Sequence, residues 1–520
     1  MKIHRLIIVL LFTSVATAQH PYDFVPSDAL AVLSIKNGDS VNSTLKIINE
    51  QSGLPTATPD AIDLGQFLEN PSVVDYSSQV LVILAPTKLA QGQKPTGMFG
   101  PMPHLILICK AKNGSALELS KVSGLKTTTT VDGWFIATGT DQWNPQNQDG
   151  LSPILASLPN AQISAIVNFG SLWKQFGSLA QMIGGMAIGS MNRPGPDGVI
   201  SPEKKKATAT ASKGFRKLIK WCATVQDISV GLNFDKFTLV AEIDVKMKEG
   251  KDPLIDNSSL VKMSKLLSDN MMQYAISGKL TRKLIDMDLD SLQELAPNYD
   301  GPPLYFITSI KAMADSINDN VVAYGLNPHN GLTITGLSDV SNQDTYLEEI
   351  FGVINESTGM LLEEFRMGLS LTNTPYTWNI SMIGSDATDK KALNAVIHDD
   401  DQLRFVKHGN NRILMAFGPK TWRPLEQSHL TPLSQVMQPY TEDVDIDFAM
   451  SFDARSFIVG FSEIAKIADS EDGFTVGTSP SAISSLLFGT TKSGTFIEIK
   501  SDLLGVATLI AEMDKEKEEF

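Results

Sequence analysis

One stretch of sequence occurs twice in the chain and predicts how the chain is organised. Residues 134–159 read WFIATGTDQWNPQNQDGLSPILASLP, and residues 413–439 read ILMAFGPKTWRPLEQSHLTPLSQVMQP. The matched pairs, each separated by 279 positions, are Gly139 and Gly418, Trp143 and Trp422, Pro145 and Pro424, Leu151 and Leu430, and Pro153 and Pro432. Proline fixes φ and keeps the preceding residue extended, so each Trp-x-Pro predicts a stiff corner that the Trp ring fills. We therefore predict two homologous halves, residues 19–290 and residues 291–520.

A second repeat has about half this period. Four segments read as a strand, a brief turn and an amphipathic helix, and they align on Ile35, Phe169, Ile310 and Phe452. This spacing predicts that each half is itself built from two strand–helix subunits.

Paired runs of alternating apolar and polar residues lie between these segments. Alternation with a period of two predicts hairpins over residues 228–245, 321–337, 367–384 and 495–511. Helix candidates follow at 258–272 and 344–357. We expect an α+β fold in two halves, each with antiparallel sheets covered by helices, and each sheet with one buried and one wetter face.

Residues 184–214 are rich in Gly, Pro and Lys, which predicts a flexible, exposed insertion. Methionines gather just before and within it, and flexible thioethers suit an adaptable apolar binding surface. Met182 and Met186 are one helical turn apart, however, and this spacing favours core filling on a helix.

The first 18 residues predict a cleaved signal peptide. Lys2 and Arg5 precede an apolar run that ends at Phe12, and small residues at 16–18 form an A-x-A-like cleavage site. The run is shorter than the ~20 residues that span a bilayer, and no later stretch is both long and apolar enough to do so. We expect a protein exported to the periplasm or the extracellular space, without a transmembrane segment after cleavage.

Composition excludes several classes of protein. The chain has 520 residues, 42% of them hydrophobic, and a formal charge of −15, which is ordinary for a globular protein and not for a disordered one. Loss of Lys2 and Arg5 with the signal peptide brings the charge from −15 to −17. We expect no nucleic-acid partner, because no excess of Lys and Arg is available to displace phosphate counterions.

The two cysteines, Cys109 and Cys222, allow two interpretations. They could form a disulfide in an oxidising compartment. Alternatively they are two buried small hydrophobic side chains, and this interpretation is favoured because free Cys is among the most buried residue types.

One set of motifs resembles that of the penicillin-recognising serine enzymes. Ser171 and Lys174 form S-x-x-K, residues 268–270 read SDN, and residues 492–495 read KSGT. The resemblance is outweighed, since S-x-x-K occurs elsewhere in the chain and the three elements are spread over both halves of a duplicated protein.

Metal and cofactor motifs are not favoured either. Residues 197–203 are similar to part of a calcium loop, but Arg193, Gly195 and Lys204 occupy ligand positions that need oxygen donors. His398 with Asp399, Asp400 and Asp401 is the one His–carboxylate cluster, and an exposed acidic turn is the favoured interpretation. We predict no catalytic, metal-binding or cofactor-binding residues and no cofactor.

The start of the mature chain, YDFVPSDALAVLSIKN, resembles a group of large exported bacterial proteins of unknown function. Pro26, Ser27, Asp28, Leu33 and Ile35 carry the resemblance. It implies an exported, duplicated α+β protein and no particular activity.

Duplication without a polar constellation for acid–base or nucleophilic chemistry favours a non-catalytic cell-envelope or extracellular protein. Its partner would be a protein or an apolar small molecule, bound by sheet faces or grooves. The alternative is a hydrolase whose site is assembled from residues distant in sequence.

Overall fold

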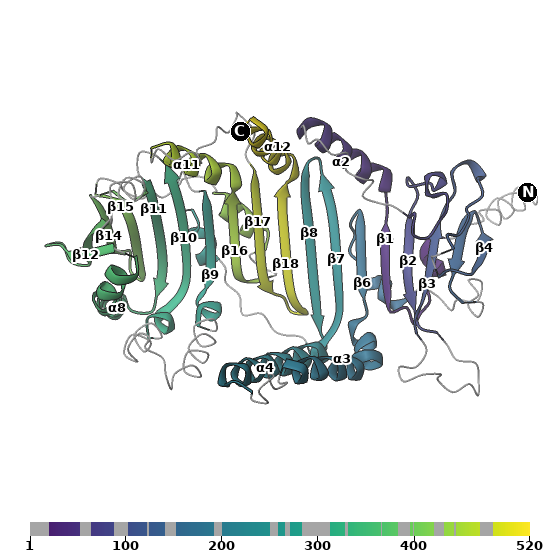
Figure 1. Cartoon of the computed structure of the whole chain (residues 1–520), viewed down its shortest axis with the longest axis horizontal. Coiled ribbons are helices and arrows are strands. Elements are labelled where there is room, and N and C mark those ends of the chain that lie inside the picture. Colours follow the sequence, from purple (N-terminus) through teal and green to yellow (C-terminus); the bar gives the residue numbers. More distant parts are fainter. Residues whose placement is uncertain are drawn as a thin grey trace, which may run out of the picture. The chain divides into compact units, whose positions relative to one another are not determined.

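A computed structural model of the chain combines helices with extensive antiparallel sheet, which confirms the predicted α+β class (Figure 1). The structure describes residues 20–52, 64–87, 102–121, 124–140, 152–191, 200–249, 258–265, 271–282, 312–327, 331–365, 367–382, 396–398, 400–420, 431–440, 444–467 and 482–519. Contacts divide the chain into two compact units. The first comprises Met1–Leu45, Thr58–Phe234 and Ile243–Glu249, and the second comprises Lys46–Ala57, Asp235–Glu242 and Gly250–Phe520.

In the first unit, all strand pairs described are antiparallel and the strands pair in the order β4-β5-β3-β2-β1-β6-β7. The strands are β1 (Ala31–Ile35), β2 (Val80–Ala85), β3 (His104–Cys109), β4 (Thr127–Val131), β5 (Trp134–Thr138), β6 (Ile163–Val167) and β7 (Val225–Asp235). The helices are η1 (Pro21–Phe24), α2 (Gly38–Ser52), η2 (Pro71–Val73), η3 (Lys112–Gly114), η5 (Pro153–Ser157), α3 (Phe169–Met191) and α4 (Pro202–Thr224). α2 begins in this unit, and its residues from Lys46 on are assigned to the second unit. β7 is followed by β8 (Thr238–Met247) after a turn in which Lys236 has a φ of 55°.

The central strands of this unit are covered on both faces, so the expectation of one wetter face is wrong here. Ile106 and Ile108 of β3 pack under Phe24 and Ile154, whereas Leu107 of the same strand packs with residues of α2 and the segments before β2. Strands buried on both faces read as continuous apolar runs, and β2 and β3 do so as VLVILA and HLILIC.

In the second unit, the strands pair in the order β12-β13-β14-β15-β11-β10-β9-β16-β17-β18, again with all described pairs antiparallel. The strands are β9 (Met272–Ser277), β10 (Ile317–Asn327), β11 (Gly331–Val340), β12 (Met367–Leu371), β13 (Thr377–Met382), β14 (Asp401–His408), β15 (Arg412–Pro419), β16 (Asp445–Asp453), β17 (Ile483–Thr490) and β18 (Gly494–Asp502). The helices are α5 (Ser258–Met263), α8 (Gln343–Phe365), α10 (Pro432–Met437), η6 (Gln438–Tyr440), α11 (Ala454–Ile467) and α12 (Leu503–Glu519).

Two clusters form the core of this unit. In one, Leu433 and Met437 of α10 and Met263 of α5 cover the strands around Ala449. In the other, Leu347 of α8 packs with residues that include Trp378, Phe405 and Ile413. Helices therefore supply apolar side chains to both clusters.

The hairpins predicted over 321–337 and 367–384 are confirmed as β10–β11 and β12–β13. The hairpin predicted over 495–511 is wrong, because β18 ends at Asp502 and α12 begins at Leu503. Asp502 Oδ1 accepts a hydrogen bond from the Gly505 amide at 3.0 Å, which satisfies one amide of the first helical turn.

The flexible segment predicted over 184–214 is helical where the structure describes it, and most of its described side chains are exposed as predicted. Residues up to 191 belong to α3 and residues from 202 belong to α4, while 192–199 lie outside the described residues. Mutual packing of α3 and α4 outweighs the low helix propensity of the glycines in α3.

The structure describes only some of the four segments of the repeat of half period. Ile310 lies outside the described residues, and the strand between β10 and β16 is β9. The division at 290/291 assigns β9 to the first half, whereas β9 pairs within the second unit. Trp143 and Trp422 lie outside the described residues, so their corner role stays a prediction.

Cys109 and Cys222 are both free and buried, so the two-hydrophobe interpretation is confirmed and no disulfide joins them. Burial raises the pKa of the Cys109 thiol to about 12.

Candidate functional site

The first candidate site is the helical hairpin formed by α3 and α4. Asn168 Oδ1 accepts a hydrogen bond from the Ser171 amide at 2.9 Å and thereby caps the start of α3. Ser201 Oγ accepts from the Lys204 amide at 3.2 Å, and Pro202 occupies the first helical position of α4. Both are ordinary N-terminal caps. Each helix has 23 residues, which corresponds to about 35 Å at 1.5 Å per residue.

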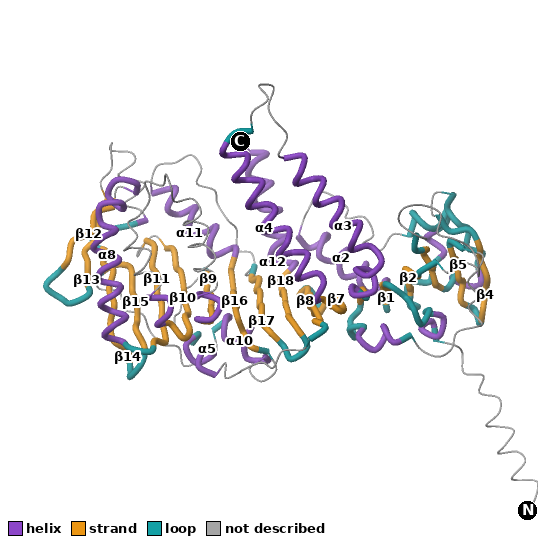
Figure 2. Tube along the Cα trace, turned by 90° about the horizontal axis from the view of Figure 1, so that it is seen from below, coloured by secondary structure: helices purple, strands orange, loops and turns teal. Residues whose placement is uncertain are grey.

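One side of α3 packs against α4 (Figure 2). Gly184 leaves room for the ring of Phe215, since a Cβ at 184 would lie 2.1 Å from Phe215 Cζ. Thr208 and Cys222 of α4 are buried. The hairpin therefore has an inner seam of close contacts between its own two helices.

The other side of α3 presents an apolar face to solvent. Leu179, Met182, Ile183 and Met186 follow the i, i+3, i+4, i+7 spacing that places side chains on one helix face. Met182, Ile183 and Met186 are 41%, 52% and 59% exposed. The prediction that Met182 and Met186 fill a core is therefore wrong. On α4, the large apolar side chains Leu218 and Trp221 are exposed as well. We call these six side chains, Leu179, Met182, Ile183, Met186, Leu218 and Trp221, the apolar set of the hairpin.

Positive charge is concentrated on α4. Its sequence contains seven Lys and Arg residues and one Glu, whereas the whole chain carries −15. The basic side chains described as exposed are Lys204, Lys205, Lys213, Arg216, Lys217 and Lys220. Apolar side chains thus lie beside a basic surface within a single supersecondary element. By contrast, α3 contains one charged residue, Lys174.

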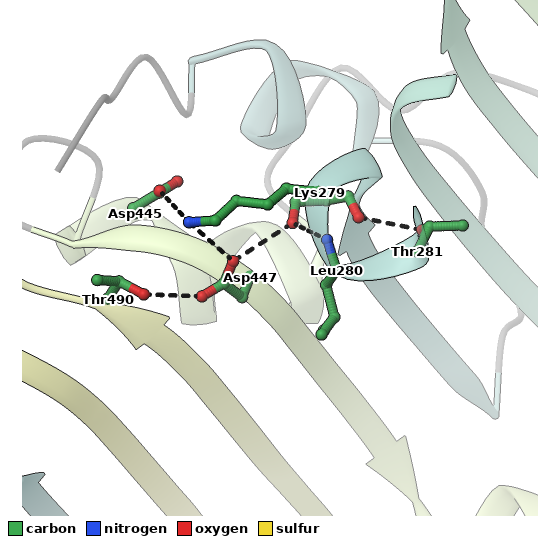
Figure 3. A network of polar contacts seen from close by, with 7 residues as sticks. Lys279, Leu280, Thr281, Asp445, Asp447 and Thr490 are labelled. Atoms are coloured by element: carbon green, nitrogen blue, oxygen red, sulfur yellow. Dashed lines mark hydrogen bonds and ion pairs between the residues drawn. The ribbon is translucent and has the colours of Figure 1, made fainter. Parts of the chain in front are cut away.

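The second candidate is a network of polar contacts at one end of β9, β16 and β17 (Figure 3). Asp447 is buried, and its Oδ2 accepts a hydrogen bond from Thr490 Oγ1 at 3.0 Å. Ser277 Oγ donates to Asp447 Oδ1 at 3.5 Å, and Lys279 Nζ lies 3.3 Å from Asp445 Oδ2 and 3.9 Å from Asp447 Oδ1. Hydroxyl donors and an ammonium group therefore stabilise the buried Asp447 carboxylate.

Asp319 adds a carboxyl group with a shifted pKa near this network. Burial, followed by the negative charges of Asp339 and Asp445, raises the pKa of Asp319 to about 7, and the Arg282 guanidinium opposes this shift. A carboxyl group that titrates near neutrality is suited to proton transfer. Asp319 is therefore the group near this network that could act as a general acid in a hydrolase.

His398, Asp400 and Asp401 come together with candidate ligand atoms within 4.8 Å of one another. The prediction of an exposed turn is wrong for Asp401, which is fully buried and whose Oδ2 accepts from the His398 amide at 2.8 Å. Burial raises the pKa of Asp401 to about 6. Three donors from one short turn could hold a divalent cation, but Asp401 is already engaged in closing that turn, which is a sufficient structural role.

The structure describes two of the three elements of the penicillin-type motif. Ser171 lies in the first turn of α3 and the Lys174 side chain is exposed. Residues 268–270 lie outside the described residues, and Lys492 lies in the turn between β17 and β18. In the calcium-loop segment, Asp197 lies outside the described residues and Ser201 is the cap of α4.

Sequence reasoning identified the methionines but not the hairpin. The i, i+3, i+4, i+7 spacing and the basic run that follows it were both readable signals for an amphipathic pair of helices. The Lys279 network gave no such signal, because Ser277 and Lys279 are 166 to 170 residues away in the chain from the Asp447 and Asp445 that they contact.

No known family matches the chain, and no curated protein matches it. Among solved structures it is similar to crystal forms III, IV and I of TP0453, with TM-scores of 0.22, 0.23 and 0.22 and 10% sequence identity. The likeness covers 50% of this chain and 98%, 96% and 96% of those chains. A likeness this weak carries no argument about function. No helix within the described residues is long and apolar enough to cross a membrane.

Proposed function

We propose that the chain is an exported, non-catalytic binding protein that acts through the α3–α4 hairpin. The observation that carries this proposal is the exposed apolar face of α3, with Met182, Ile183 and Met186 in one stripe. An apolar helix face that the described residues leave open to solvent marks an interaction surface more often than a scattered exposed residue does. Export is supported by Lys2, Arg5 and the small residues at 16–18.

We also propose that the fold is duplicated within the chain. The pairing order of the seven strands of the first unit, β4-β5-β3-β2-β1-β6-β7, corresponds to the order β14-β15-β11-β10-β9-β16-β17 in the second. Ser152 precedes η5 and Thr431 precedes α10, each with a Pro at the next position. α3 follows β6 just as α11 follows β16, but the described part of the second unit has no second helix comparable to α4. The hairpin is therefore the feature by which the first unit would have acquired its own binding role.

Photo-crosslinking in cells that export the chain tests the binding function. A photoreactive amino acid replaces Met186 in one variant and Met102, which is 67% exposed and lies off the hairpin, in the other. We expect adducts with a cell-envelope component at position 186 and not at position 102. Equal labelling at both positions, or no adduct at either, contradicts the proposal.

A second candidate function, hydrolysis, is favoured by one observation, the raised pKa of Asp319 beside Asp339 and Asp445. Such a group could act as a general acid. A screen with ester, peptide and glycoside substrates tests it: turnover that Asp319→Asn abolishes would support this candidate, and turnover that survives the substitution would contradict it.

A further inference from the structure

We infer that the partner of the α3–α4 hairpin is the surface of an anionic lipid bilayer. This inference rests on the proposed function, because it names what the same surface binds. The hairpin combines an exposed apolar stripe with a strongly basic neighbouring helix, in a chain that is otherwise acidic. That combination is what an interfacial helix needs, since the apolar side chains enter the acyl boundary while Lys and Arg meet the headgroups.

Charge complementarity favours an anionic surface as the partner of the hairpin. α4 has a formal charge of +6, from seven basic residues and Glu203, and the exposed Lys217 and Lys220 lie within one turn of Trp221. An anionic surface attracts such a segment, while the acidic remainder of the chain is repelled.

The nature of the apolar side chains favours lipid as well. Met182 and Met186 are flexible and suit a fluid surface, and Trp221 is of the type that concentrates at membrane interfaces. The stripe on α3 extends over two helical turns and contains no charged residue. We therefore place α3 along the surface of a bilayer.

Flotation with vesicles tests the inference. The purified chain is mixed with vesicles of phosphatidylglycerol and phosphatidylcholine in equal parts, or of phosphatidylcholine alone. We expect at least about tenfold more protein to float with the anionic vesicles at low salt, and this excess to fall steeply near 1 M salt as charges are screened.

Two variants separate the two components of binding. Ile183→Asp with Met186→Asp removes the apolar stripe, and Lys217→Glu with Lys220→Glu reverses two charges. Both should lose at least about tenfold in vesicle binding. Met102→Asp and the pair Lys121→Glu with Lys466→Glu change exposed residues elsewhere and should bind as the parent chain does. Far-ultraviolet circular dichroism verifies that each variant is folded.

Flotation and crosslinking together distinguish failure of the lipid inference from failure of the binding function. If neither kind of vesicle floats the chain while crosslinking at position 186 still yields a protein adduct, the lipid inference is wrong and the binding function stands. If both kinds of vesicle bind equally, or if either hairpin variant binds as the parent does, the inference is also wrong.

Discussion

Gly184 of α3 lies against the ring of Phe215 of α4, and a side chain at 184 would occupy the space of that ring. This contact fixes how the two helices of the hairpin pack, and so which face of α3 points outward. A glycine in a helix interior is otherwise unfavourable, so the close approach explains its presence.

Gly184→Ala is therefore expected to destabilise the first unit by about 1–3 kcal/mol, because the added methyl group must displace Phe215. Gly185→Ala is the matched control. A Cβ at 185 meets nothing within 4 Å, and the gain in helix propensity should stabilise by about 0.5–1 kcal/mol. Denaturant unfolding of both variants measures the difference. Equal effects of the two substitutions would contradict the packing described for Gly184.

Thr431 and Ser152 occupy matched positions, since each directly precedes a helix that begins with Pro. Thr431 Oγ1 donates to the Ser264 carbonyl at 2.5 Å and accepts from the Ser434 amide at 3.3 Å. Ser152 is equally buried, but its Oγ has no partner among the described residues. Thr431→Ala should therefore cost about 1–2 kcal/mol and Ser152→Ala close to nothing. A larger loss from Ser152→Ala in equilibrium unfolding would refute this asymmetry.

The raised pKa of Asp319 predicts that its carboxyl group lowers the unfolding free energy as the pH rises. Its pKa is raised from 3.8 to about 7, mainly by burial. A carboxyl group with a raised folded-state pKa costs nothing when it is protonated in both states, and its cost grows as pH rises from about 4 to 7. The carboxyl group is partly accessible to solvent, so we expect this cost to be about 1–2 kcal/mol.

Asp319→Asn should remove that cost. Relative to the parent chain, the variant should gain about 1–2 kcal/mol of unfolding free energy between pH 4.5 and pH 7.5. Asp315→Asn removes a carboxyl group at an exposed neighbouring position and serves as the control. A constant offset for Asp319→Asn would mean that the Asp319 carboxyl group does not carry the raised pKa.

Local sequence patterns predicted the hairpins β10–β11 and β12–β13, because a period of two followed by turn residues identifies both strands. The predictions were wrong where one sequence pattern is compatible with two kinds of secondary structure. The run after Asp502 alternates like a strand but forms α12, and the Gly-rich run at 184–191 forms the end of α3. In both cases the deciding interactions, a cap at Asp502 and the Phe215 contact, depend on particular side-chain positions.

One of the two candidate sites could have been predicted from local sequence patterns, and the other could not. The spacing of Leu179 to Met186 and the basic run in α4 lie within 46 residues of chain, so the amphipathic hairpin was within reach of sequence reasoning. The contact between Lys279 and Asp445 depends on β9 lying beside β16. That pairing is long-range, and no local pattern encodes it.

The outward face of α3 is the proposed binding surface of the chain. The most direct test of this proposal is the emission of an environment-sensitive bimane label at Met186→Cys, compared with the same label at Met102→Cys, both in a Cys222→Ala background. On addition of anionic vesicles we predict a blue shift at position 186 and none at position 102. An unchanged emission at 186, an equal shift at 102, or a label at 186 that is already shielded before vesicles are added would contradict the claim.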